Sequence, residues 1–164
     1  MKTLFLARHG KSSWSHPELP DEKRPLLVKG ENNTKFIAEQ LLSKVVKVDL
    51  IISSPVVRAL ETAKIIALIL KYPEENIKTD NIIYSADANG LFDPLFDLSD
   101  SIESVMIIGH NPAMTYFVNN FIEKKVDNLP TSGVICVSLK IDKWQDIIKP
   151  NGKELFRIFP KAEE

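Results

Sequence analysis

The sequence predicts an α/β protein built around parallel strands. Short apolar runs alternate with longer segments of helical periodicity along the chain. Three of the apolar runs end directly in polar motifs: Arg8-His9-Gly10, Ser53-Ser54-Pro55 and Gly109-His110-Asn111. With 164 residues the chain is long enough to bury one sizeable core, so we expect residues 1–164 to form a single domain.

The first half of the chain predicts two strand–helix units. The run from Leu4 to Ala7 is a strand, and the polar, proline-containing residues 11–27 form a long loop. Apolar residues near helical spacing predict a helix from about Lys29 to Ser43, followed by a buried strand from Val48 to Ile52. Ser54 and Pro55 resemble an N-cap and a first helical residue, which predicts a helix from there to Leu70.

The second half predicts further strands and shorter helices. Asn111-Pro112 repeats the cap-and-proline pattern and predicts a helix to about Ile122. A turn is expected at Asn151-Gly152. The other expected elements are a weak strand over Ile77 to Tyr84, a short helix over residues 89–98, and strands over Val105 to Ile108, Val134 to Leu139 and Leu155 to Phe159.

The composition is that of an ordinary globular protein and argues against several classes of partner. The net charge of −1 offers no general surface for nucleic acid or for a membrane. No run approaches the roughly 20 apolar residues of a membrane span, and the amino-terminal run is interrupted by Arg8-His9. Cys136, the one cysteine, excludes an internal disulfide. We therefore expect a cytoplasmic protein.

Two arginines and two histidines carry the functional prediction. Arg8, His9, Arg58 and His110 all lie just past the ends of predicted strands. If these strands are parallel neighbours, the four side chains meet at one edge of the sheet, where open α/β proteins bind ligands. Guanidinium groups and helix N-termini bind phosphoryl oxygens, and a neutral imidazole can act as a nucleophile.

Other chemistries lack their motifs in this chain. There is no H-x-x-x-H or C-x-x-C spacing for zinc, and nearby arginines would repel a divalent cation. The serine-hydrolase pattern G-x-S-x-G, the Walker loop and the dinucleotide fingerprint are all missing. Cys136 lies in an apolar run typical of a buried, unreactive thiol. We expect no metal and no cofactor.

Five segments carry a resemblance to a known family. They are Arg8-His9-Gly10-Lys11-Ser12-Ser13-Trp14, Arg24-Pro25-Leu26 with Gly30, Ser53-Ser54-Pro55-Val56-Val57-Arg58-Ala59 with Thr62-Ala63, Tyr84-Ser85-Ala86, and Gly109-His110-Asn111-Pro112. In this order they resemble the histidine phosphatase superfamily, and within it the small SixA-type phosphohistidine phosphatases. The resemblance covers about two thirds of the chain. It implies a three-layer α/β/α fold with a mostly parallel central sheet, the phosphoglycerate-mutase-like fold.

The resemblance also implies a role for individual residues. His9 would be the nucleophile that becomes transiently phosphorylated, while Arg8, Arg58 and His110 would bind the phosphoryl oxygens. Lys11, Arg24 and Ser53 would contact the substrate or its phosphate. These roles agree with the physics of phosphoryl transfer, which depends mainly on positioning and on electrostatic stabilisation.

One departure from the family pattern bears on the substrate. Many members carry an acid that protonates the leaving oxygen, but Tyr84-Ser85-Ala86 offers none, and Asp87, Asp21 and Glu18 are open alternatives. The leading hypothesis is a metal-independent phosphatase acting on protein phosphohistidine. The alternatives are a phosphomonoesterase for small phosphorylated metabolites with the same His9 chemistry, and a weakly active module that binds phosphate or phosphoproteins.

Overall fold

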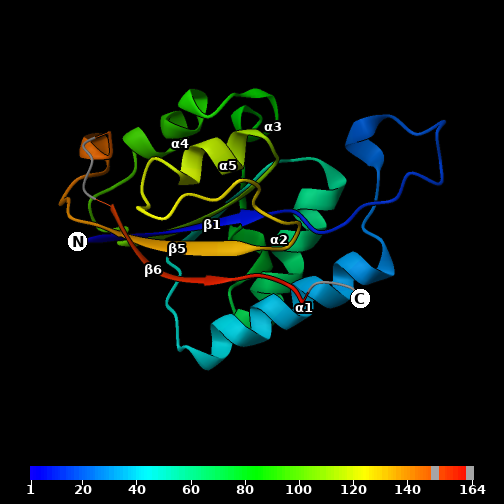
Figure 1. Cartoon of the computed structure of the whole chain (residues 1–164), viewed down its shortest axis with the longest axis horizontal. Coiled ribbons are helices and arrows are strands. Elements are labelled where there is room, and N and C mark those ends of the chain that lie inside the picture. The colour runs from blue at the N-terminus through cyan, green and yellow to red at the C-terminus, as the bar shows by residue number, and fades with distance from the viewer. Residues whose placement is uncertain (149–151, 162–164) are drawn as a thin grey trace.

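Helices cover both faces of a six-stranded sheet in the computed structural model, which describes residues 1–148 and 152–161 (Figure 1). The strands are β1 (Lys2–Arg8), β2 (Leu50–Ser53), β3 (Lys78–Thr79), β4 (Ser104–Gly109), β5 (Val134–Leu139) and β6 (Gly152–Ile158). They lie in the order β3-β2-β4-β1-β5-β6. The pairs within β3-β2-β4-β1 are parallel, and β5 and β6 pair antiparallel at the other edge. The predicted three-layer, mostly parallel architecture is confirmed.

The two helical layers pack on opposite faces of the sheet, and β1 shows why. Its side chains alternate between the faces, as in any strand. Leu4 and Leu6 belong to the apolar cluster beneath α3 (Ile82–Ser85), α4 (Asp93–Phe96) and α5 (Ala113–Val118). Phe5 and Ala7 belong to the cluster beneath α1 (Val28–Ser43) and α2 (Val57–Leu70). Residues 4–7 of β1 are therefore all apolar, because both faces of the strand are buried there.

Several predicted boundaries are wrong, and side-chain hydrogen bonds accompany each shift. Helix α2 begins at Val57, two residues after Pro55, and the Ser54 hydroxyl contacts His110 Nε2 (2.8 Å). Helix α5 ends at Val118 and not near Ile122, because the Asn119 side chain bonds both backbone groups of Val126 and turns the chain.

The weak strand predicted over Ile77 to Tyr84 is reduced to β3. The Asp80 carboxylate accepts a hydrogen bond from the backbone of Ile82, which starts α3 in place of a longer strand. The turn predicted at Asn151-Gly152 includes Asn151, which lies outside the described residues. In residues 1–148 and 152–161, no helix is long and apolar enough to cross a membrane.

Glycine at position 30 allows the first helix to approach the loop that follows β1. A Cβ atom at Gly30 would lie 2.3 Å from the backbone oxygen of Lys11, a contact that no side chain can make. The same oxygen accepts a hydrogen bond from Leu27 N (2.9 Å). The amino-terminal end of α1 is thereby fixed against the segment that carries His9.

Candidate active site

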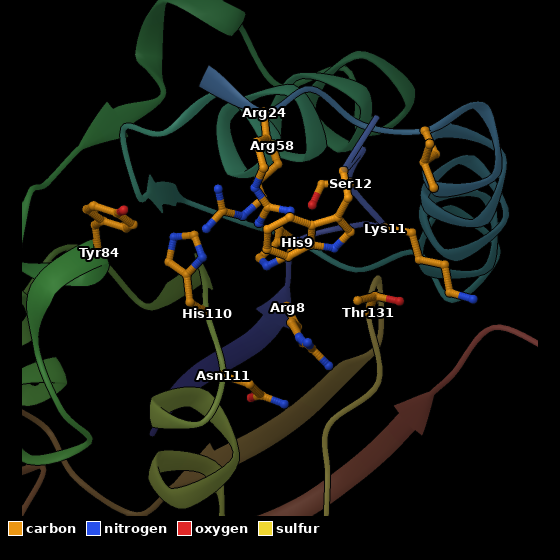
Figure 2. Close-up of a pocket in the computed structure, with 12 residues that line it drawn as sticks. Arg8, His9, Lys11, Ser12, Arg24, Arg58, Tyr84, His110, Asn111 and Thr131 are labelled. Carbon is orange, nitrogen blue, oxygen red and sulfur yellow. The ribbon is translucent and has the colours of Figure 1, made fainter. Parts of the chain in front are cut away.

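A pocket of about 570 Å³ opens where β2, β4 and β1 end (Figure 2). These strands are parallel neighbours, so the residues that follow them lie at one edge of the sheet. The residues that line the pocket come from the loops after β1 and β4, the start of α2, α3 and the segment before β5. They are Arg8, His9, Lys11, Ser12, Trp14, Arg24, Leu27, Arg58, Tyr84, His110, Asn111 and Thr131.

The structure brings together all but one of the residues named from the sequence. Arg8, His9, Arg58 and His110 line this pocket, together with Lys11 and Arg24. Ser53 does not line it, because its side chain is fully buried and its hydroxyl donates to the Ser54 carbonyl (2.9 Å).

The ring of His9 is buried and held in one tautomer. Its Nδ1 lies 2.7 Å from the Gly10 carbonyl oxygen, which can only accept a hydrogen bond. The proton therefore resides on Nδ1, and Nε2 keeps its lone pair. Burial, and then the charges of Arg58 and Arg8, lower the pKa of His9 to about 4, against the opposing effect of the Gly10 hydrogen bond. His9 is thus a neutral imidazole near neutral pH.

Thr62 fixes the backbone beside His9. Its hydroxyl accepts a hydrogen bond from Gly10 N (3.0 Å) and donates to the Arg58 carbonyl oxygen (2.8 Å). One side chain of α2 therefore ties the residue after His9 to the turn that presents Arg58. This link sets the position of the imidazole relative to the guanidinium.

His110 is the second neutral imidazole of the pocket. Its ring centroid lies 5.0 Å from that of His9 and 5.3 Å from that of Tyr84. Burial, and then the neighbouring His9 and Arg58, lower the pKa of His110 to about 3. Its Nε2 lies 2.8 Å from the Ser54 hydroxyl, and when that hydroxyl donates, the ring proton resides on Nδ1, which can then donate a hydrogen bond.

Asp21 holds two of the arginines from the loop that follows β1. Arg58 donates to the Asp21 backbone oxygen through Nη1 (2.8 Å) and to its carboxylate through Nη2 (3.0 Å). Arg24 donates from Nε to the other carboxylate oxygen (3.1 Å), and its guanidinium stacks 3.4 Å over the Trp14 ring. Both guanidinium groups are thereby fixed in orientation before any substrate binds.

Four buried nitrogen atoms around the pocket have no hydrogen-bond partner among the described residues. They are Arg8 Nε, Arg24 Nη1, Arg58 Nε and His110 Nδ1. A buried N–H group without a partner costs free energy, on the order of 1–3 kcal/mol and more when the group is charged. All four belong to residues that line this pocket. The arrangement suits a tetrahedral anion with several acceptor oxygens.

None of the three acids considered from the sequence is placed as a proton donor. The Tyr84 hydroxyl donates to the Asp21 carboxylate (2.7 Å), and this bond, followed by the contacts from Arg58, lowers the pKa of Asp21 to about 2. Asp21 is therefore ionised near neutral pH. Asp87 is exposed and bonds Gly90 N, while Glu18 pairs with His16.

Six pocket residues were not named as site residues from the sequence. Ser12, Trp14, Tyr84 and Asn111 belong to the motifs that carry the family resemblance, which was the available signal. Leu27 and Thr131 lie outside those motifs. Within residues 1–148 and 152–161, no cluster of three histidine, cysteine or acidic side chains could hold a metal ion.

Comparison with known sequences gives two matches. Residues 4–81 match the family model of the histidine phosphatase superfamily (branch 1). An uncharacterized protein of Picosynechococcus sp. is 38% identical over 64 residues. That alignment covers 39% of this chain and 39% of the relative, so it spans well under half of the relative's length.

Solved structures share the fold over nearly the whole chain. The protein histidine phosphatase SixA, solved in complex with tungstate, has a TM-score of 0.80 and 22% identity, with 96% of this chain and 97% of that chain covered. A candidate phosphohistidine phosphatase SixA from Agrobacterium tumefaciens has a TM-score of 0.82 and 22% identity, with 97% and 98% covered. At these identities the likeness establishes the fold.

Proposed function

We propose that the chain is a member of the histidine phosphatase superfamily, whose family model matches residues 4–81, and that it hydrolyses protein phosphohistidine through a phosphorylated His9, without a metal ion. One observation carries this proposal. His9 keeps its proton on Nδ1, and unpartnered nitrogens of Arg8, Arg58 and His110 line the same pocket. A nucleophile and the donors that stabilise a transferring phosphoryl group therefore share one site.

The reaction divides into two displacements at phosphorus. His9 Nε2 attacks the phosphoryl group, the bond from phosphorus to the leaving group breaks, and the phosphoryl group is transferred to His9. A water molecule then attacks the phosphorus of the phosphorylated His9, and the bond from phosphorus to Nε2 breaks. Inorganic phosphate is released, and His9 returns to its neutral form. Arg8 and Arg58 neutralise the phosphoryl oxygens in both steps.

The absence of a placed acid favours phosphohistidine as the substrate. An alkoxide leaves phosphorus poorly unless it is protonated, and general acid catalysis contributes about 10²–10⁴-fold. The ionised Asp21 cannot supply that proton. An imidazole leaving group can take a proton from solvent near neutral pH, so a P–N bond needs no acid from the protein.

The test combines a trapping experiment with a substrate series. Protein quenched during turnover should carry acid-labile phosphate on His9, and His9→Ala should lose at least about 10⁴-fold in rate while it stays folded. The value of kcat/KM should fall from a phosphohistidine peptide to p-nitrophenyl phosphate to a phosphoserine peptide. Label on another residue, or activity in His9→Ala, would refute the mechanism.

Two other outcomes would refute the substrate assignment. If phosphoserine or a sugar phosphate is hydrolysed as fast as phosphohistidine, the protein is a phosphomonoesterase with an acid of its own. If phosphopeptides bind and no substrate turns over, the chain is a binding module.

A further inference from the structure

The candidate active site runs from a buried end at His9 to an open rim, and Trp14 lies exposed at that rim. His9 is 8% exposed, whereas Trp14 is 76% exposed although it lines the same pocket. Tryptophan side chains are largely buried on average in globular proteins, as Trp144 of this chain is. An exposed indole at the mouth of a pocket offers a large apolar surface to a ligand.

The exposed indole is nevertheless held in place. The Arg24 guanidinium lies over one face of the ring, 3.4 Å from its centroid, and Asp21 accepts a hydrogen bond from Arg24 Nε. The backbone before Trp14 is bonded to the backbone after Arg24, because Ser13 N donates to the Pro25 oxygen (2.9 Å). A ring fixed in this way loses little conformational freedom when a ligand binds to its open face.

The position of Arg24 places the indole next to the site of the phosphoryl group. Arg24 is buried in the pocket wall, and its Nη1 has no hydrogen-bond partner among the described residues. Burial lowers the pKa of His9 most, and the charge of Arg24 adds to the effects of Arg58 and Arg8, so Arg24 lies close to the imidazole. Because Trp14 stacks on Arg24, it borders the space just outside a phosphoryl group held by this arginine.

The geometry of the displacement directs the leaving group toward the rim. In phosphoryl transfer the attacking and leaving atoms lie roughly in line with phosphorus. His9 attacks from the buried end of the pocket, so the leaving group lies on the opposite side, toward solvent. The ring of Tyr84 is already engaged, since its hydroxyl bonds Asp21 and its edge packs against His110. Trp14 therefore has the ring face that is open to the leaving group.

We propose that the open face of Trp14 stacks against the ring of the leaving group, which is the imidazole of a phosphohistidine substrate. The inference rests on the proposed function for the identity of that ring, and it makes Trp14 a specificity-determining residue. Stacking of two aromatic rings is favourable beyond the apolar area that it buries, and a leaving group without a ring cannot gain it. The site thereby selects flat aromatic leaving groups.

The test compares two substrates that share a P–N bond and differ in the ring. Phosphohistidine releases an imidazole, whereas phosphoramidate releases ammonia. We define the ring ratio as kcat/KM for phosphohistidine divided by kcat/KM for phosphoramidate. Trp14→Ala should lower the ring ratio about 3- to 10-fold, as expected for the loss of one aromatic pair. Because both substrates need Arg24 for the phosphoryl group, the ratio corrects for any displacement of this arginine.

Further variants separate stacking from a merely structural role. Trp14→Phe keeps a ring and should keep most of the ring ratio. Trp14→Leu still covers Arg24 but has no ring, so the ratio should fall as in Trp14→Ala. The control is Tyr116→Ala, which removes an exposed ring of α5 that does not line the pocket and should leave the ratio unchanged. If Trp14→Ala and Trp14→Leu slow both substrates equally, or slow neither, the proposal is wrong.

A binding experiment separates this inference from the proposed function. If phosphohistidine is not hydrolysed, the proposed function fails, and calorimetry with phenylphosphonate and cyclohexylphosphonate decides about Trp14. Both probes carry an apolar six-membered ring, but only the phenyl ring is flat and aromatic. The wild-type protein should bind phenylphosphonate about 3- to 10-fold more tightly, and Trp14→Leu should lose this preference while Tyr116→Ala keeps it. Equal binding of the two probes to the wild-type protein would overturn the stacking site.

Discussion

His9 and His110 lie in the same pocket, but their hydrogen bonds give them different capacities. The Gly10 carbonyl oxygen holds the proton of His9 on Nδ1 and leaves Nε2 free to attack. The Ser54 hydroxyl contacts Nε2 of His110, and when it donates there, Nδ1 carries the ring proton. In that tautomer the two imidazoles are suited to opposite tasks, one as nucleophile and one as hydrogen-bond donor.

The charge state of His9 gives a prediction about pH. An ordinary histidine, with a pKa of about 6.5, is roughly three quarters protonated at pH 6. His9, with a pKa of about 4, should remain neutral there and protonate only as the pH falls through about 4. Long-range ¹H–¹⁵N NMR spectra of histidine-labelled protein in phosphate-free buffer should show the Nδ1–H tautomer of His9 at pH 6. A ring that is half protonated between pH 6 and 7 would contradict the assignment.

Arg58 should be far more important for activity than an exposed residue of the same helix. Arg58→Ala removes a charged donor from the pocket. The activation free energy should rise by about 2–4 kcal/mol, so kcat/KM should fall roughly 30- to 1000-fold. Arg58→Lys should not restore full activity, because an ammonium cannot contact both Asp21 and a phosphoryl oxygen in a fork geometry. Lys64→Ala, an exposed lysine of α2, is the control. Equal activity of Arg58→Ala and Lys64→Ala would remove Arg58 from the site.

At the scale of elements, the long loop between β1 and α1 acts as part of the site wall. Residues 11–27 contain a short 3₁₀ turn at Asp21–Lys23, whose first residue contacts Arg58, Arg24 and Tyr84. The loop thus crosses from the end of β1 to the start of α2 and to α3. A single carboxylate joins these elements around the pocket.

This arrangement predicts that Asp21 is a positioning residue. Asp21→Asn weakens the contacts that orient Arg58 and Arg24, so kcat/KM should fall about 10-fold. The loss should be the same for aryl phosphates with good and with poor leaving groups. A loss that grows as the leaving group becomes poorer would show that Asp21 donates a proton. The exposed neighbour Glu22→Gln, which also faces Tyr84, provides the control.

At the scale of the whole molecule, the strand order explains why distant residues meet. Strand β4 lies between β2 and β1, so Arg58, His110 and His9 follow three adjacent parallel strands. The antiparallel β5 and β6 extend the far side of β1 and bring Thr131 and Lys161 near the same edge. The sheet therefore collects positive side chains from the first, middle and last parts of the chain.

The positive charge of the arginines in the pocket predicts a reaction that needs no metal ion. Arg8, Arg24 and Arg58 supply the positive charge that phosphoryl oxygens need. Hydrolysis of the preferred substrate should therefore continue at an unchanged rate in excess chelator. A loss of activity that Mg²⁺, Mn²⁺ or Zn²⁺ restores would show that the electrostatics of the site are incomplete without a cation.

The sequence by itself determined the α/β class, most of the strands and the four residues at the strand ends. Apolar periodicity and the residues that follow a buried strand are local properties, so His9 and His110 could be placed after their strands without a structure. The resemblance to family motifs added the prediction of a three-layer fold. Boundaries failed where a side chain bonded to a distant or irregular segment, as Ser54 does with His110 and Asn119 with Val126.

Only the tertiary structure decided which groups touch. Asp21, Arg58 and Tyr84 are far apart in sequence, and their contact depends on how the loop after β1 packs across α2 and α3. The same holds for the burial of Ser53. Proximity between distant segments follows from the packing of the whole chain, which local patterns do not encode.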